Sequence, residues 1–218
     1  MSHPLRFGIA VLVAAVVGAP PAAAAPDTSA LSVLATLAVQ AADPMTGYSR
    51  DQFGPAWTDN NDDVLGHNGC DTRDDILARD LIDVVRDGSC TVISGVLHDP
   101  YTGQTIQFQR GRDTSTAVQI DHVVALGNAW ISGAQHLSPQ QRVDLANDPR
   151  NLLAVDGPAN NNKRDHNAAE WLPPNAAFRC TYVADQINVK SIYTLWVTPE
   201  EKTAMTEILS SCPEGPTQ

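Results

Sequence analysis

The sequence predicts an α+β fold in which one small antiparallel sheet lies under several helices. Residues 118–121 and 151–156 are short runs with the apolar pattern of strands, and they flank a long segment with helical patterning. Helix-start signals at 138–141 and 198–201 place Ser or Thr before Pro, with Gln or Glu three positions after the cap. A chain of 218 residues is long enough for one domain with a full core.

Residues 1–25 have the pattern of a signal peptide and are set aside from the fold. Arg6 supplies a positive start, and the apolar stretch 7–19 is too short to span a membrane comfortably. Small residues before Pro26 offer a cleavage site, so we expect a secreted, extracellular protein cleaved near Ala25. An uncleaved anchor is the alternative. No later segment is apolar enough to cross a bilayer, so no stable membrane association is expected for the mature chain, 26–218.

Export makes disulfides plausible, and the mature chain has four cysteines. They are Cys70, Cys90, Cys180 and Cys212, and four cysteines allow three pairings. The local pairing, Cys70–Cys90 with Cys180–Cys212, closes one helix-containing loop in each case. A zinc site made of all four thiolates is the alternative, although the sequence has no C-x-x-C spacing.

The mature chain is expected to begin with a helix and a long loop. Residues 28–39 are apolar and compatible with a helix that docks on the core. Residues 41–69 are rich in Asp, Asn, Gly and Pro, so they are expected to be mostly loop. Tyr48, Phe53 and Trp57 would pin this loop to the core.

Residues 72–88 are expected to form the next helix. Thr72 and Asp75 resemble a capping box with a shorter acid, and Gly88 would end the helix. Its apolar face would carry Leu77, Leu81, Val84 and Val85.

A pair of strands and then the two central strands follow. Residues 90–97 and 105–110 are expected to be strands around a turn at 99–103. The first central strand ends on the adjacent ionisable residues Asp121 and His122.

The second central strand leads through a Gly-Pro turn into a short polar helix, on which Asn160 and Lys163 share one face. Polar groups therefore gather at one end of a unit made of strand, insert, strand and helix. The helix that starts after Ser138 would end before Pro149. Near the C-terminus, one set of residues sits at helical spacing: Val189, Ile192, Tyr193 and Trp196. The last helix would point Ala204, Met205, Ile208 and Leu209 inward. Residues 213–218 are a tail.

The charge of the chain excludes a broadly basic protein that coats nucleic acid. Acidic residues outnumber Lys and Arg by 25 to 14, and the isoelectric point is about 4.7. A nuclease with this composition would need a local basic patch or a metal ion to hold phosphate.

The polar residues at the ends of the central strands fit the chemistry of phosphodiester hydrolysis. His122 suits the general base, because an unperturbed imidazole titrates near neutrality. Asp121 and Asn160 offer one carboxylate and one amide oxygen, a hard ligand set that suits Mg²⁺ or Mn²⁺. Such an ion would clamp the phosphate and stabilise the leaving oxygen. Because adjacent residues of a regular strand point to opposite faces, the strand must end or bulge at this point.

The motifs resemble the HNH, or ββα-metal, nuclease superfamily, and most closely secreted bacterial HNH-family proteins and the C-terminal nuclease domain of GmrSD-type restriction enzymes. The core motifs are I-D-H-V-V-A-L (120–126), A-W-x-S-G-A (129–134), N-D-x-x-N-L-L-A-V (147–155), N-x-x-K-x-D (160–165) and A-E-W-L-P-P (169–174). Outside the core, the likeness to the secreted group rests on Y-S-R-x-x-F-G-x-x-W (48–57), N-G-C-D-T-R (68–73) and D-P-Y-T-G (99–103).

This resemblance implies a ββα-metal core in which Asp121 and Asn160 are metal ligands and His122 is the base. It implies that Asn151 orients the loop that carries the base. Asn stands where the name-giving pattern ends in His, which favours oxygen-binding metals over zinc.

Two cationic residues are weaker candidates for the same site. Lys163, with its neighbour Arg164, would add positive charge beside the phosphate. Arg73 would reach the same phosphate across the fold.

Each of these residues also has an ordinary structural interpretation. Asp121 and His122 alone would fit a strand-end turn with a satisfied histidine. The run 160–162 would fit a polar helix start, which leaves the ligand assignment open by one position. Lys163 and its neighbour would fit a solvated face, and Arg73 would pair with Asp74 or Asp75.

We therefore expect a secreted, divalent-metal-dependent endonuclease that acts as a monomer on DNA, with RNA as a second substrate. Little sequence preference is expected, because the chain has no separate module that reads sequence. The alternative is a non-catalytic exported binding or structural module on the same scaffold, as the acidic composition suggests. A phosphoesterase acting on a small substrate would instead show a closed pocket.

Overall fold

The computed structural model describes residues 28–212, so the expected signal peptide 1–25 and the tail 213–218 lie outside it. The helices are α1 (Thr28–Thr36), α2 (Thr72–Asp80), α3 (Leu126–Ile131), α4 (Pro139–Asn147), α5 (Gly157–Lys163), α6 (Arg179–Ile192) and α7 (Pro199–Ser210). The strands are β1 (Leu81–Asp87), β2 (Thr91–His98), β3 (Thr105–Gln109), β4 (Val118–His122) and β5 (Leu152–Asp156).

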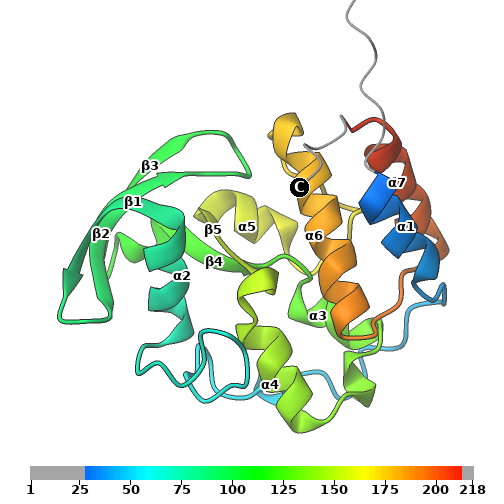
Figure 1. The fold of residues 1–218 in the computed structure, drawn as a ribbon, viewed down its shortest axis with the longest axis horizontal. Coiled ribbons are helices and arrows are strands. Elements are labelled where there is room, and N and C mark those ends of the chain that lie inside the picture. The colour runs from blue at the N-terminus through cyan, green and yellow to red at the C-terminus, as the bar shows by residue number, and fades with distance from the viewer. Residues whose placement is uncertain (1–27, 213–218) are drawn as a thin grey trace, which may run out of the picture.

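The fold is α+β, as predicted, but the strands divide between two antiparallel sheets. The sheet β1-β2-β3 and α2 form one end of the molecule, and α1, α6 and α7 form the other (Figure 1). The pair β4-β5 and α5 lie between them. The central unit is therefore covered from both sides.

The central unit confirms the predicted order of strand, insert, strand and helix. β4 and β5 pair in regular register from Val118 opposite Asp156 to His122 opposite Leu152. α5 begins directly after β5, because the Asp156 side chain accepts a hydrogen bond from the Ala159 amide at 2.8 Å. Asp156 is thus both the last residue of β5 and the N-cap of α5.

The insert between the central strands contains α3 and α4. Ser138 and Gln141 form the predicted capping box, and α4 ends at Asn147, before Asp148 and Pro149. The insert packs on the short helix Arg50–Phe53 and on the end of α6, through an apolar cluster that contains Phe53, Trp130 and Val189.

The prediction of one helix over 72–88 is wrong. α2 ends at Asp80, and Leu81–Asp87 forms β1, which pairs with β2. The run 81–85 is rich in branched apolar residues, which pack well on a pleated sheet. Gly88 makes the hairpin turn with a φ of 65° instead of ending a helix.

The cap of α2 also differs from the prediction. Asp71, not Thr72, is the N-cap, and its carboxylate accepts a hydrogen bond from the Asp74 amide at 2.8 Å. The Thr72 hydroxyl donates instead to Asn147 Oδ1 at 2.9 Å. This bond ties α2 to the end of α4.

The strands β2 and β3 and their turn are as predicted. Gly103 has a φ of 74°, and its amide donates to the Asp99 carbonyl oxygen at 2.9 Å. The turn places Tyr101, which is fully buried, against the central unit.

The C-terminal helices were predicted in part. α7 has the predicted capping box of Thr198 and Glu201. α6 runs from Arg179 to Ile192, so only the first two positions of the expected pattern, Val189 and Ile192, are helical, and Trp196 lies beyond the helix. The chain leaves α6 at Thr194, whose φ is 54°.

The loop before α2 is pinned as predicted. Tyr48 and Phe53 pack with Trp130, with ring centroids 6.0 and 6.2 Å away. Trp57 packs against the cluster under the three-stranded sheet. Across residues 28–212, none of the helices is both long and apolar enough to cross a membrane.

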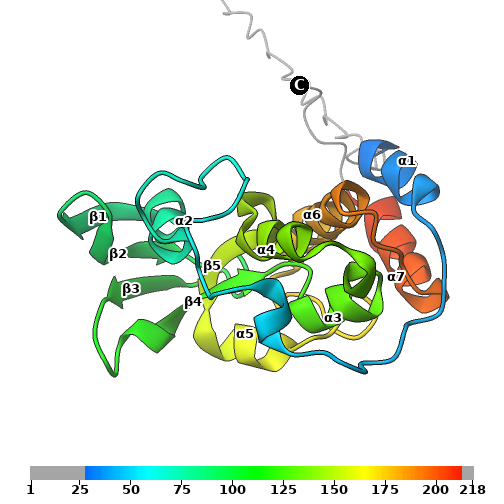
Figure 2. The ribbon, with the colours of Figure 1, turned by 90° about the horizontal axis from the view of Figure 1, so that it is seen from below.

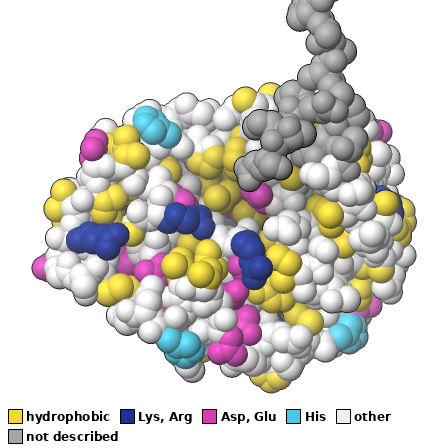
Figure 3. Space-filling view, in the orientation of Figure 1, with side chains coloured by type: hydrophobic (Ala, Val, Ile, Leu, Met, Phe, Trp, Pro, Cys, Tyr) yellow, Lys and Arg dark blue, Asp and Glu magenta, His cyan; other side chains and the backbone are white. Residues whose placement is uncertain are grey.

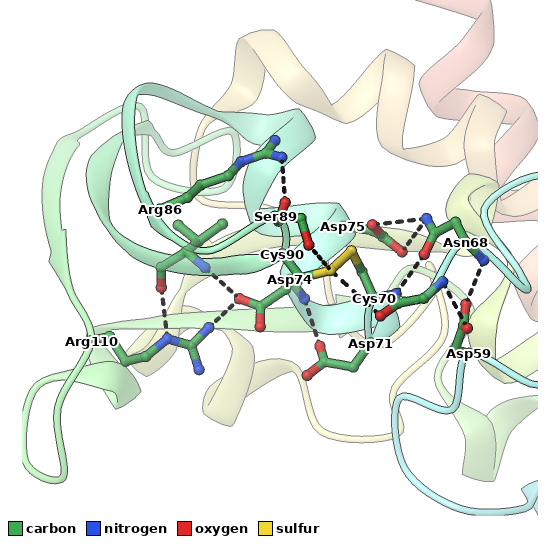
Figure 4. Close-up of a disulfide and its surroundings, with 12 residues drawn as sticks. Asp59, Asn68, Cys70, Asp71, Asp74, Asp75, Arg86, Ser89, Cys90 and Arg110 are labelled. Atoms are coloured by element: carbon green, nitrogen blue, oxygen red, sulfur yellow. Dashed lines mark hydrogen bonds and ion pairs between the residues drawn. A yellow bond between two sulfur atoms is a disulfide. The ribbon is translucent and has the colours of Figure 1, made fainter.

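Both disulfides have the predicted local pairing, Cys70–Cys90 and Cys180–Cys212. The thiolate zinc site is therefore ruled out. Figure 4 shows that the first disulfide joins the start of α2 to the β1-β2 hairpin, near the ion pair of Asp74 and Arg110. The second ties α6 to the end of α7.

We expect the double variant C180S/C212S to lose about 3 to 4 kcal/mol of unfolding free energy in urea, because the disulfide closes a loop of 32 residues. Adding a reductant should lower the stability of the native protein but cause a smaller change in this variant. Equal urea midpoints for native protein and variant would contradict a stabilising role.

Candidate active site

Asp121, His122 and Asn160 line one hollow beside the end of β4 and α5, with a volume of about 320 Å³. Arg50, from the short helix Arg50–Phe53, also lines the hollow. The other residues that line it are Gln119, Ile120, Ala125, Leu126, Asn161, Arg164 and Asp165. Three side chains that the sequence singled out from distant positions therefore face the same space.

Asp121 is held by two hydrogen bonds at the bottom of the hollow. Lys163 Nζ donates to Asp121 Oδ1 at 3.0 Å, and the Tyr101 hydroxyl donates to Oδ2 at 2.5 Å. Burial raises the pKa of the Asp121 carboxyl, and the charge of Lys163 and the two hydrogen bonds oppose that rise. Each carboxylate oxygen has further lone-pair capacity, so these bonds leave Asp121 able to bind a cation.

Lys163 lies beneath the hollow and not beside a phosphate, contrary to expectation. Its side chain is completely buried, and Nζ also donates to the carbonyl oxygen of His122 at 2.7 Å. One ammonium thus fixes both the carboxylate of Asp121 and the backbone of the next residue. Neither the predicted role at the phosphate nor a solvated face fits this position.

The His122 ring is clamped from two directions. The Trp57 ring stacks on it with a centroid distance of 5.5 Å and an interplanar angle of 11°, and Nε2 lies 2.9 Å from the Ala146 carbonyl oxygen. A carbonyl oxygen only accepts, so Nε2 carries the proton and Nδ1 is the acceptor of the neutral ring. Burial lowers the pKa of His122 to about 3, so the ring is neutral at pH 7.

The sequence required β4 to end or bulge at Asp121 and His122 if both side chains were to reach one site, and β4 ends there. β4 pairs regularly up to His122 and ends there without a bulge. Asp121 points toward Tyr101 and Lys163, whereas His122 points toward Trp57 and Ala146, on the other side of the strand. Both reach the hollow because it lies across the strand end.

Asn160 lies on α5, opposite the end of β4. Its Nδ2 donates to Gln119 Oε1 at 2.9 Å, and its Oδ1 accepts no hydrogen bond from residues 28–212. Asn161 also lines the hollow, whereas Asn162 Oδ1 accepts from the Trp171 indole at 3.0 Å. Asn160 therefore offers a held amide oxygen, and Gln119 is a residue that the sequence analysis did not single out.

Asn151 is fully buried and joins two segments around the base. Its Oδ1 accepts from the Val124 amide at 2.8 Å, and its Nδ2 donates to the Leu145 carbonyl oxygen at 3.1 Å. It ties the segment after β4 to the end of α4, next to the Ala146 carbonyl that binds His122. The positioning role that the family resemblance implies for Asn151 stays a prediction.

Arg73 is not brought to the hollow. Its guanidinium donates to the Val118 carbonyl oxygen at 3.1 Å, at the opposite end of β4 from His122. With a rise of about 3.4 Å per residue, the two ends of this strand lie about 13 Å apart. Arg73 also forms no ion pair with Asp74, which binds Arg110, or with Asp75, which accepts from Asn68.

Arg50 and Arg164 are the cationic residues at the hollow, and both are exposed. Arg50 contributes to lowering the pKa of His122, after burial and against the hydrogen bond to Ala146. The sequence analysis did not single out Arg50 as a site residue. The available signal was its position in the motif 48–57, where Phe53 and Trp57 anchor the loop.

The donors at the hollow fit a hard cation. Within residues 28–212, no three His, Cys, Asp or Glu side chains come together in a group that would hold a metal by themselves. The hollow instead offers the Asp121 carboxylate and the Asn160 amide oxygen. An ion that keeps much of its water and binds through few protein oxygens, such as Mg²⁺, suits this set.

We expect K163M to lose about 3 kcal/mol of unfolding free energy, because the buried Asp121 carboxylate then lacks its counter-ion. The double variant K163M/D121N should regain much of this loss, since the unpaired charge is gone. Urea denaturation of the single and double variants measures both effects. Equal losses in K163M and K163M/D121N would show that the ion pair is not the cause.

Comparisons with known proteins agree with the motifs. The chain matches the family model "GmrSD restriction endonucleases, C-terminal domain" over residues 71–208. A relative from Arthroderma benhamiae (strain ATCC MYA-4681 / CBS 112371), described as "Uncharacterized secreted protein", is 41% identical over 187 residues, which covers 85% of each chain. No solved structure matches the chain. The chain therefore belongs to the family of GmrSD restriction endonuclease C-terminal domains.

Proposed function

We propose that the protein is an exported, divalent-metal-dependent endonuclease that hydrolyses phosphodiester bonds of DNA, with RNA as a second substrate and little sequence preference. The observation that carries the proposal is the meeting of Asp121, His122 and Asn160 in one hollow. Membership of a restriction endonuclease domain family supports it. In this proposal residues 26–218 form a single nuclease domain that acts as a monomer.

Export is supported by two observations. The relative from Arthroderma benhamiae is described as secreted, and all four cysteines form disulfides, which persist in oxidising compartments. Cleavage of the leader near Ala25 is part of the proposal.

Asp121 and Asn160 would hold Mg²⁺ or Mn²⁺ through one carboxylate oxygen and one amide oxygen. When bound, the ion supplies positive charge to the phosphate and to the departing 3′ oxygen. The Gln119 contact turns the Asn160 amide so that its nitrogen is occupied and its oxygen is available. Lys163 holds the Asp121 carboxylate in place from below.

His122 is the proposed general base. The bond from Nε2 to the Ala146 carbonyl oxygen leaves Nδ1 to take the proton from the attacking water. The same carbonyl oxygen stabilises the charged imidazolium that forms, because a hydrogen bond from a charged donor is stronger than one from a neutral donor. The stacked Trp57 ring keeps the imidazole plane fixed during the transfer.

Arg50 and Arg164 are the proposed contacts to the phosphate. On the face shown in Figure 3, the Lys and Arg side chains lie apart from one another with Asp and Glu among them, so phosphate binding requires a local arrangement. The two arginines at the hollow supply the local positive charge that the acidic chain needs.

The first test is cleavage of circular DNA, which has no ends and so reports endonuclease activity alone. Mature protein with Mg²⁺ or Mn²⁺ should nick or linearise supercoiled plasmid and cut single-stranded circles, and EDTA should stop both reactions. Intact circles with every divalent metal tested would favour a non-catalytic binding module instead.

The second test compares two histidines. H122A should cleave about 100-fold more slowly or worse, because a positioned general base contributes at least that much. It should still bind Mn²⁺, as measured by electron paramagnetic resonance. H98A is the matched control, because His98 is exposed and, within residues 28–212, its ring has one hydrogen-bond partner, Thr105, at 3.1 Å. Equal rates for H122A and native protein would remove His122 from the mechanism.

A further inference from the structure

A second hollow, with a volume of about 550 Å³, adjoins the proposed active site. It lies between β3, the segment 113–117 and the start of α5. The two hollows share Gln119 and Asn161, so they lie next to each other. Figure 2 shows β3, the chain that follows it and α5 along the same side of the molecule. We call this second hollow the amide trough.

The amide trough has a mostly apolar lining, and no Lys or Arg is among the residues that line it. β3 contributes Gln107 and Gln109 from its exposed face, while Phe108 between them is buried on the other face. The remaining polar side chains are Gln119, Asn161, Asp113, Thr114 and Thr116. Amides and hydroxyls therefore make up most of its polar groups, and they lie among apolar atoms.

The two hollows differ in what they can bind. Phosphate is recognised mainly by cationic groups, and these lie at the active site as Arg50 and Arg164. Side-chain amides offer donors and acceptors together, which is the pattern that nucleobase edges and sugar hydroxyl groups present. A polynucleotide would fit the two neighbouring hollows together, because its phosphates alternate with sugars and bases.

We propose that the amide trough binds the nucleotides next to the scissile phosphate, so that the substrate is a polynucleotide chain and not a small phosphodiester. This inference rests on the proposed function. It assigns Gln107 and Gln109 to contacts with bases and sugars, at a distance from the residues of hydrolysis. These contacts act on binding and not on the chemical step.

The test compares a small diester with DNA chains of increasing length. The substrates are bis(p-nitrophenyl) phosphate and oligodeoxynucleotides of about 2 to 12 nucleotides, and the protein variants are Q107A/Q109A and the control Q104A/Q140A. Gln104 and Gln140 are exposed and line neither hollow. Because all four glutamines are exposed, thermal unfolding should be the same in both variants.

In Q107A/Q109A, kcat/KM for the long oligonucleotides should fall about tenfold, as expected for two lost hydrogen bonds, while hydrolysis of the small diester stays within about twofold. The control variant should match the native protein on both substrates. An equal fall on both substrates, or no fall on either, would overturn the inference. Failure of the native protein on every substrate would overturn the proposed function instead.

A binding measurement tests the trough without turnover. Fluorescence anisotropy of a labelled 12-nucleotide strand on H122A should show a Kd about tenfold weaker when Q107A/Q109A is added, and an unchanged Kd would contradict the proposal. The slope of log Kd against log salt should be about 1.4, because two arginine contacts to a single strand release about 0.7 counterion each. A much steeper slope would contradict the proposal, because the added binding would come from cationic side chains outside the trough.

Discussion

The ammonium of Lys163 lies buried at the end of β4, 3.0 Å from Asp121 Oδ1 and 2.7 Å from the carbonyl oxygen of His122. A buried carboxylate without a counter-ion would be protonated or would destabilise the fold. Lys163 removes that cost and at the same time fixes the two adjacent residues that the chemistry needs. It also joins α5, which carries Asn160, to β4, so the distance between the proposed metal ligands depends on this contact.

The cationic side chains near this contact fall into two groups, one buried in the fold and one exposed at the hollow. The cation inside the protein compensates Asp121, whereas Arg50 and Arg164 face the hollow and remain available to substrate. This separation would let a chain with a net charge of −11 form the proposed phosphate site without a broad basic surface. Arg50, which lines the hollow, and Trp57, which stacks on His122, come from residues before the segment 71–208 that matches the family.

Local signals predicted the central unit, the caps at Ser138 and Thr198, and both disulfides. They failed for 81–87, because an apolar run of that length fits both helix and strand, and only its pairing with β2 decides. The sequence also predicted only some of the polar residues at the hollow. Motif spacing indicated Asp121, His122 and Asn160, but the burial of Lys163, the distance of Arg73 and the presence of Arg50 depend on contacts between segments far apart in sequence.

The central claim is that Asp121 and Asn160 hold one divalent cation beside the His122 ring. Anomalous scattering from crystals of the mature protein soaked in Mn²⁺ tests it most directly. The account predicts a single strong peak about 2.0 to 2.3 Å from a carboxylate oxygen of Asp121 and from Oδ1 of Asn160, and its loss in N160A. A peak at any other group of residues, with none in this hollow, would contradict the account.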